Sequence, residues 1–372
     1  MAPPKNPMKV PTGWRARYRT PEGGSRMRTF KRREGAVRFL NETRSAIDRG
    51  TFVDPKAGRV TVARWWELYR VQVPKRPTTA ARDLAVMRRW WLPALGNVQV
   101  AKLTPVAVRG VVTSMQTAGK APATVRTNFA VFRAVMSTAV EADLIGRTPC
   151  RGVKLPAERR EGPRFLTSEE LGRLADATPV EYRPMIYVAG VLGLRWSEVA
   201  GLRVGRCDFL RRTVTVAETL SEVEGRLLFA DVKTRSSHRT LTAPAELMEM
   251  LGAHLARRGR PGPDELVFVA VEGGPVRAAA FRSRVWKPAV ERAGLSGITF
   301  HGLRHSAVGY MIELGAHPRV VQQRAGHSSV RTTLDVYGSV FPSVDEEVAV
   351  GLGAVLEPRV ISVSRGGSGT GA

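Results

Sequence analysis

The residues best suited to chemistry lie close together near the C-terminal end of the chain. His301 and Arg304 are three positions apart, so at the start of a helix they share one face. Gly326 is typical of a helix C-cap, and His327 follows it directly. The sequence predicts one more short helix after this point, which carries Tyr337 back toward His301 and Arg304.

Together these side chains suit an attack on a phosphodiester. A guanidinium group binds two phosphate oxygens at once. Imidazoles transfer protons, and a tyrosine hydroxyl can act as the nucleophile. A helical core with incidental histidines explains any one of these residues, but it does not explain their combination and order.

The order of these residues resembles a known family. HGLRH at 301–305, AGH at 325–327 and then Tyr337 are similar to the second conserved box of the tyrosine recombinases, the lambda-type phage integrase family. Gly302 stands where an aspartate is common, and Ala325 where the family usually has leucine. Neither position is catalytic in the family, so the resemblance implies the same chemistry here.

Two further segments extend the resemblance upstream. GLRWSEVAGL at 193–202 resembles the first box, in which Arg195 corresponds to a phosphate-binding arginine, and we expect Glu198 to orient a neighbouring group. The turn at 234–237 predicts a hairpin between the strands on either side of it. Lys233 lies just before this turn, where the family keeps a lysine; a solvent-exposed lysine at a turn is the alternative.

The composition narrows the class of protein. The 372 residues carry 58 lysines and arginines against 33 aspartates and glutamates, a net charge of +25. This charge indicates nucleic acid or another polyanion as the partner, although a ribosomal or membrane-surface protein would share it. Cys150 and Cys207 form neither a disulfide framework nor a metal-ligand pattern. No apolar run reaches the roughly 18 residues that span a bilayer, so we expect no membrane partner. The two cysteines make a reducing cytoplasm the default location, and the resemblance implies the cytoplasm of a bacterial host cell, on the nucleoid.

The first 35 residues are strongly basic, and basic and apolar residues alternate within them. Around the turn at 21–24, apolar residues at 14, 16 and 18 would point to one side of a strand. Arg15, Arg17 and Arg19 would point to the other side, and Arg28 continues the pattern after the turn. A small sheet followed by a helix at about 34–49 resembles the arm-type DNA-binding domain of phage integrases. A solvated basic tail is the alternative.

The next hundred residues predict helices. Thr61 and Thr104 are candidate N-caps, and apolar residues recur at three- and four-residue steps from Val125 to Val140. Four helices at about 60–147 predict a compact bundle, which in the family is the core-binding domain. Lys120 and Arg126 are candidate phosphate contacts there, with ordinary surface charges as the alternative. Thr167 and Glu170 predict a capping box where a new domain begins.

We therefore expect an α+β fold that is mostly helical: a small N-terminal sheet and helix, a helical bundle, and a mixed domain with a small antiparallel sheet. The expected domains are an arm-type DNA-binding domain at 1–57, a helical core-binding domain at 58–149, a linker at 150–163, a catalytic domain at 164–350 and a C-terminal tail at 351–372. A further helix is expected after Tyr337, at about 343–356.

The resemblance implies site-specific DNA recombination. Tyr337 would attack the scissile phosphate and form a 3′-phosphotyrosyl link, Arg195 and Arg304 would bind the nonbridging oxygens, and Lys233 would protonate the leaving 5′ oxygen. His301 would assist proton transfer, and His327 would hydrogen-bond the phosphate. The bond energy is conserved in the link, so we expect no cofactor, no metal and no ATP.

The implied partners are double-stranded DNA attachment sites, on which the protein would form a homotetramer, and possible accessory DNA-bending or directionality proteins. The implied role is integration and excision of a phage or mobile element. A type IB topoisomerase would share the chemistry, and a DNA-binding regulator without catalysis would share the fold. The six catalytic-type residues disfavour the regulator, and the arm-like N-terminus disfavours the topoisomerase.

Overall fold

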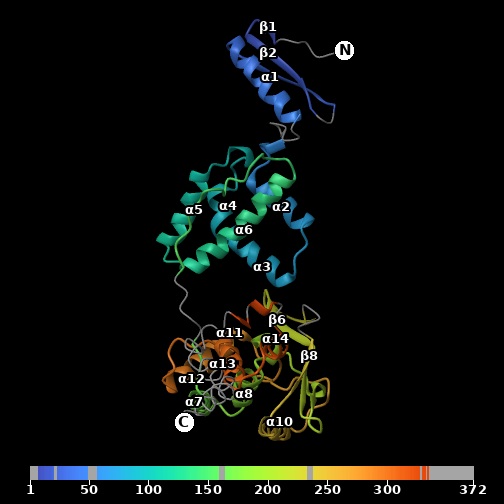
Figure 1. Ribbon diagram of the computed structural model, residues 1–372, viewed down its shortest axis with the longest axis vertical. Helices are drawn as coiled ribbons and strands as arrows, with labels where there is room; N and C mark the ends of the chain where they lie inside the picture. The colour runs from blue at the N-terminus through green and yellow to red at the C-terminus, as the bar shows by residue number, and fades with distance from the viewer. Residues whose placement is uncertain are drawn as a thin grey trace, which may run out of the picture. The chain divides into compact units, whose positions relative to one another are not determined.

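The computed structural model of the chain describes residues 7–20, 23–48, 57–158, 164–232, 238–326, 329–331 and 333–334 (Figure 1). The chain divides into two compact units, Met1–Arg159 and Arg160–Ala372, and the boundary falls inside the predicted linker. Each unit has its own buried core. In the described part of the chain, no helix is both long and apolar enough to cross a membrane.

The first unit begins with a three-stranded antiparallel sheet and a helix. The elements are β1 (Met8–Val10), β2 (Gly13–Arg19), β3 (Ser25–Phe30) and α1 (Arg33–Asp48), and the strand order is β1-β2-β3. The predicted alternation holds in β2, because Ala16 and Tyr18 are buried while the three arginines between and beside them are exposed. Tyr18 packs edge-on against Phe39 of α1, with ring centroids 5.5 Å apart, so α1 covers the apolar face of the sheet.

The rest of the first unit is the predicted helical bundle. Its helices are α2 (Val62–Gln72), α3 (Pro77–Val86), α4 (Leu92–Leu95), α5 (Pro105–Thr117) and α6 (Pro122–Glu141). A π-helical segment, Met87–Trp91, joins α3 to α4. Thr61 and Thr104 cap α2 and α5 as predicted. Trp91 is fully buried, stacks on Phe132 of α6 at 4.1 Å and donates its indole N–H to the carbonyl of Asn128.

The second unit is built around α8 (Arg183–Leu192), whose side chains are almost all buried. α13 (Phe300–Glu313), α7 (Ser168–Asp176) and α10 (Ala245–Arg257) pack against it. The remaining helices are α9 (Trp196–Ala200), α11 (Ala278–Phe281), α12 (Lys287–Arg292) and α14 (Pro318–Ala325). The capping box of Thr167 and Glu170 starts α7 as predicted. The fold is therefore α+β and mostly helical, as the sequence indicates.

The strands of this unit form two small antiparallel sheets. One has the order β4-β5-β8, from β4 (Cys207–Asp208), β5 (Thr213–Val216) and β8 (Arg239–Thr242); the other pairs β6 (Glu218–Val223) with β7 (Arg226–Asp231). The hairpin predicted across 234–237 is wrong, because β7 pairs with β6 and β8 pairs with β5. The β6–β7 hairpin turns at Glu224 and Gly225, with φ of 50° and 78°. Two successive positive φ angles are typical of a type I′ turn, and Glu-Gly is not the usual sequence signal for it.

Candidate active site

Arg195 is placed by the end of α8. Gly193 ends this helix in the left-handed conformation, with φ of 71°, which glycine adopts without steric cost. The chain then turns so that Arg195 is the N-cap residue of α9. Its backbone N–H donates to Glu198 Oε2 at 2.9 Å. The backbone of Arg195 is thus held by contacts within its own segment.

His301 and Arg304 are placed by the start of α13. The Thr299 hydroxyl caps this helix by accepting from the N–H of Gly302, and His301 and Arg304 follow on its first turns as predicted. Arg304 is buried and donates from Nη1 to the carbonyl of Gly193 at 2.7 Å. This bond holds its guanidinium beside the turn that leads into Arg195.

One nitrogen of Arg304 is available for a ligand. Within the described residues, Nη2 of Arg304 is buried and has no hydrogen-bond partner. A buried donor without a partner costs about 1–3 kcal/mol, and more for a charged group. An anionic oxygen bound at this point would remove that cost.

Glu198 links the half-buried Arg195 to the buried Arg239. Its Oε1 accepts from Arg195 Nη1 at 2.9 Å, and its two oxygens accept from Arg239 Nη1 at 3.2 Å and Nη2 at 2.9 Å. Arg195 also donates from Nη2 to the carbonyl of Gly326 at 2.9 Å. Glu198 therefore orients a neighbour, as the sequence predicted, and it holds Arg195 at the end of α14.

The charges in this cluster do not balance. Arg195 and Arg239 pair with the carboxylate of Glu198. Arg304 makes no ion pair with it within the described residues, but lies close enough to feel its charge and those of the other two arginines. Burial, and then the charge of Arg195, lower the pKa of Arg304 to about 9. Burial alone would raise the pKa of Glu198, but the hydrogen bonds and charge of Arg239, followed by those of Arg195, outweigh it and hold that pKa below its usual value. The excess positive charge makes the cluster an anion site.

His301 faces the same positive field. The residue as a whole is exposed, but partial desolvation of its ring lowers its pKa to about 4, with further lowering by His305, Arg304 and Arg195. The rings of His301 and His305 meet edge-to-face with centroids 4.8 Å apart. At neutral pH the imidazole of His301 is therefore uncharged, and one ring nitrogen can accept a proton.

An aromatic cleft of 750 Å³ opens beside His301. Trp196, Phe281, Trp286 and Phe300 line it, and their rings pack on one another at centroid distances of 4.8 to 5.8 Å. This packing supports the first turn of α13, because Phe300 is the first residue of that helix. A Cβ at position 302 would lie 2.6 Å from Cδ1 of Ile298, which also lines the cleft, so a larger residue there requires the end of the Ile298 side chain to move.

The structure brings together three of the six predicted catalytic residues, Arg195, His301 and Arg304. Lys233, His327 and Tyr337 lie outside the described residues, as do the predicted hairpin turn and the helices expected around and after Tyr337. The described elements end close to each of them: β7 ends at Asp231, and α14 ends one residue before Gly326.

The N-terminal arginines occupy two different faces of the sheet. Arg15, Arg17 and Arg19 are exposed on the face away from α1. Arg28 pairs directly with Ala16 across the ladder, so it shares the apolar face. Its guanidinium lies 5.1 Å and 5.2 Å from the ring centres of Phe30 and Phe39. Its placement with the other three arginines was therefore wrong, because the pairing register puts it on the opposite side.

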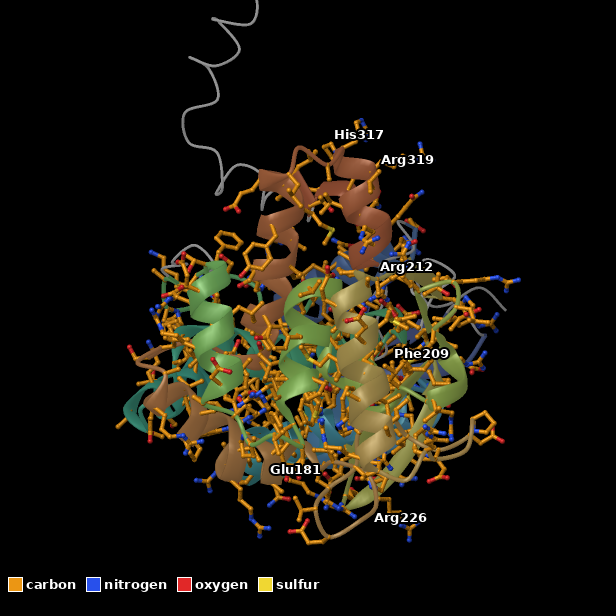
Figure 2. All side chains as sticks on the ribbon, turned by 90° about the horizontal axis from the view of Figure 1, so that it is seen from below. Glu181, Phe209, Arg212, Arg226, His317 and Arg319 are labelled. Carbon is orange, nitrogen blue, oxygen red and sulfur yellow. The ribbon has the colours of Figure 1, made fainter. Side chains whose placement is uncertain are left out.

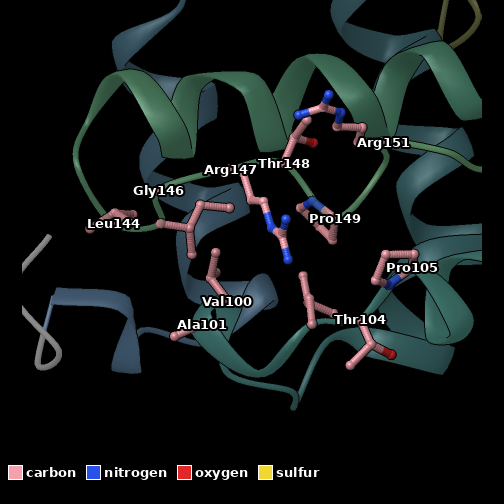
Figure 3. Close-up of a pocket in the computed structure, with 12 residues that line it drawn as sticks. Val100, Ala101, Thr104, Pro105, Leu144, Gly146, Arg147, Thr148, Pro149 and Arg151 are labelled. Atoms are coloured by element: carbon pink, nitrogen blue, oxygen red, sulfur yellow. The ribbon is translucent and has the colours of Figure 1, made fainter. Parts of the chain in front are cut away.

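Lys120 and Arg126 are both exposed in the helical bundle. Lys120 lies in the loop between α5 and α6, while Arg126 donates from Nε to the carbonyl of Pro156 at 3.0 Å. A separate groove of 810 Å³ lies between the start of α5 and the loop after α6, with Arg147 pointing into it (Figure 3). Neither Lys120 nor Arg126 lines this groove.

Sequence reasoning missed Arg239 and His305. Arg239 opens β8, whose burial alternates so that Arg239 and Leu241 face inward. An arginine at an inward strand position predicts a buried acidic partner, and this signal was present in the sequence. At the N-terminal end of α14, the N-cap residue His317 and the helix residue Arg319 are exposed and project outward (Figure 2).

Comparisons with known proteins show the family and the fold of the chain. Residues 164–343 match the model of the phage integrase family. The integrase of Mycobacterium phage FRAT1 is 32% identical over 265 residues, which cover 69% of this chain and 77% of the relative. Two solved structures share the fold. The Tn1549 transposon integrase in complex with a circular intermediate DNA has a TM-score of 0.67 and 20% identity, and the match covers 75% of this chain and 95% of that one. A lambda integrase tetramer bound to a Holliday junction has a TM-score of 0.56 and 16% identity, and the match covers 88% of this chain and 97% of that one. The chain therefore belongs to the phage integrase family of tyrosine recombinases, which break and rejoin DNA.

Proposed function

We propose that this chain recombines DNA at specific attachment sites, and that it integrates and excises a phage genome or another mobile element. The observation that carries the proposal is the buried, unsatisfied Nη2 of Arg304 beside Arg195, in a cluster with excess positive charge. A scissile phosphate is the anion that such a site suits in a DNA-breaking enzyme. Its nonbridging oxygens gain charge in the transition state, where fixed donors stabilise them most.

In the proposed reaction, the phenol oxygen of Tyr337 attacks phosphorus and the bond to the 5′ oxygen breaks. His301 takes the phenol proton, which its uncharged imidazole is able to accept. Lys233 gives a proton to the leaving 5′ oxygen, and His327 hydrogen-bonds the phosphate. The product is a 3′-phosphotyrosyl link and a free 5′ hydroxyl.

The second half of the reaction reverses the first. The 5′ hydroxyl of a partner duplex attacks the 3′-phosphotyrosyl link and releases Tyr337. Two such exchanges, on one strand and then the other, pass through a Holliday junction, and a homotetramer would hold the four DNA arms. The lambda integrase structure is a tetramer on such a junction, which supports the same assembly here. Accessory DNA-bending or directionality proteins would select between integration and excision.

The predicted domains give the protein two ways of holding DNA. We propose that residues 1–57 bind an arm-type site through the exposed face of Arg15, Arg17 and Arg19. We propose that residues 58–149 bind the core site, with Lys120 and Arg126 on phosphates, while 164–350 carry catalysis. Arg28 would support the arm domain through its aromatic contacts.

Strand exchange between two duplexes tests the proposed function. The purified full-length chain is mixed with two different labelled duplexes that carry the flanks of its own gene. We expect products that join one duplex to the other. Relaxation of supercoiled DNA without joint products would support a topoisomerase instead, and binding without any strand breakage would support a regulator.

A further inference from the structure

Arg239 takes part in a closed ring of interactions that joins three elements. Its guanidinium donates two hydrogen bonds to Glu198 at the start of α9, and its Nε donates to the carbonyl of Arg324 at 2.8 Å, near the end of α14. Two residues later, the carbonyl of Gly326 accepts from Arg195. Arg195 returns to Glu198 through Nη1 and its backbone N–H.

This ring places Arg239 between the parts of the site that must act together. The start of α9 carries Arg195. The end of α14 is followed in the sequence by Gly326 and His327. β8 begins at Arg239, which follows the segment that contains Lys233 in the sequence. Arg239 itself is 8% exposed and pairs with the same carboxylate that Arg195 bonds, so Glu198 connects the two arginines.

The carboxylate of Glu198 needs two partners to hold its orientation. Arg195 bonds only Oε1 with its side chain, at the exposed edge of the cluster, where its own side chain is 35% exposed. Arg239 bonds both oxygens from a buried position, with side-chain exposures of 6% and 2% for the pair. Bidentate pairing of this kind adds geometric specificity as well as energy. Without Arg239 the carboxylate keeps, within the described part of the chain, only the donors of Arg195, its backbone N–H and Nη1. It loses its buried anchor, and Arg195 is then held less firmly.

We infer that Arg239 is a positioning residue for DNA cleavage, which fixes Arg195 through Glu198 and fixes the end of α14 through the carbonyl of Arg324. The inference rests on the proposed function, since it assigns Arg195 to the scissile phosphate. Arg239 does not touch the DNA in this account. Its loss should therefore resemble the loss of Arg195 rather than the loss of a general acid.

Three substrates distinguish the loss of phosphate binding by Arg195 from the loss of a general acid. The first is a nicked duplex with a normal scissile phosphate, which traps the covalent adduct. The second carries a methylphosphonate at the scissile position, which has no negative charge for an arginine to stabilise. The third carries a 5′-bridging sulfur, whose departure needs no proton. Covalent attachment is measured on each with full-length wild-type protein and with Arg239→Gln, Arg239→Lys and Arg195→Ala.

A matched control is Arg203→Gln. Arg203 also pairs with one carboxylate, that of Glu218, at 2.9 Å, and with one backbone carbonyl, that of Asp264, but it makes no bond to Glu198. Thermal melting and DNA binding of each variant report folding. If Arg239→Gln does not fold, the test passes to Arg239→Lys, which keeps the charge but has a single donor group that cannot reproduce the fork geometry.

We expect Arg239→Gln to attach to the normal phosphate at least about 100-fold more slowly than wild type, as for a small misplacement of a catalytic group, while DNA binding stays close to that of the wild-type protein. On the methylphosphonate the defect should shrink toward the wild-type rate, as for Arg195→Ala, and the 5′-sulfur should not restore it. Arg239→Lys should show a smaller defect with the same substrate pattern.

The inference is overturned by any of three results. The first is that the Arg239 variants cleave the normal phosphate as fast as Arg203→Gln does. The second is an equal defect on all three substrates. The third is that the 5′-sulfur restores cleavage and the methylphosphonate does not, which would assign Arg239 to the segment of Lys233. If the wild-type protein forms no adduct on any substrate, the proposed function fails before the inference is tested.

Discussion

Replacing Glu198 by glutamine should destabilise the second unit strongly. The carboxylate is 2% exposed and accepts from the backbone and Nη1 of Arg195 and from two nitrogens of Arg239. Glutamine fills the same space but carries no charge, and its NH2 group would face guanidinium donors. Three arginines would then share the cluster without an acidic partner in it.

The expected loss follows from the burial of the pair. Removing one partner of a buried ion pair costs about 3–5 kcal/mol, because the other charge is left uncompensated. For a unit of this size, each kcal/mol lowers the melting temperature by roughly 2–4 °C, so the transition of this unit should fall by about 6–20 °C. Differential scanning calorimetry of the full chain, with guanidinium unfolding beside it, measures both quantities.

A suitable control is Glu218→Gln. Glu218 also pairs with two arginines, Arg203 and Arg206, but its side chain is 22% exposed, and pairs nearer to solvent contribute about 0–1 kcal/mol. The reasoning about the cluster is refuted if Glu198→Gln loses less than about 1 kcal/mol, or no more than Glu218→Gln.

Three other predictions concern single parts of the account. Folding lowers the pKa of His301 from 6.5 to about 4, so the unfolded chain binds more protons between these pH values and the free energy of unfolding should fall as the pH drops through them. The guanidinium midpoint of His301→Gln should therefore vary less with pH than that of wild type, and equal slopes would contradict the lowered pKa. Lys233→Ala should slow DNA cleavage by about 10²–10⁴-fold and should be rescued by a 5′-bridging sulfur; rescue of Arg195→Ala alone would reverse the two roles. Deleting residues 1–57 should lower the slope of log affinity against log salt on long attachment DNA by about 3, from three arginines at about 0.9 each, while cleavage of a short core duplex continues; undiminished recombination of full-length sites would show that the segment is only a basic tail.

Local rules accounted for most of what the sequence predicted correctly. Thr61, Thr104 and Thr167 each cap a helix as expected, because capping depends on residues within one turn. His301 and Arg304 share the start of α13 for the same reason. Their neighbour Arg195 follows from the turn at Gly193 and from the resemblance of its segment to the first box of the family.

The features that the sequence did not predict depend on pairing between distant residues. Arg239 and Glu198 are 41 positions apart, and no local pattern states which buried carboxylate an inward arginine will meet. The face of Arg28 depends on the register between β2 and β3, which a shift of one residue would reverse. The turn at 234–237 predicts a hairpin between the strands beside it, whereas β7 pairs with β6 and β8 with β5; these partners depend on contacts outside the turn.

The central claim is that Tyr337 forms a covalent link to DNA within the site built by Arg195 and Arg304. The most direct measurement is covalent attachment to a nicked duplex that carries the core site, followed by denaturing electrophoresis, with wild type, Tyr337→Phe and the control Tyr187→Phe. We expect all three proteins to bind the duplex alike, and we expect wild type and Tyr187→Phe to form the adduct while Tyr337→Phe forms none. An adduct on the Tyr337→Phe protein would show that Tyr337 is not the nucleophile.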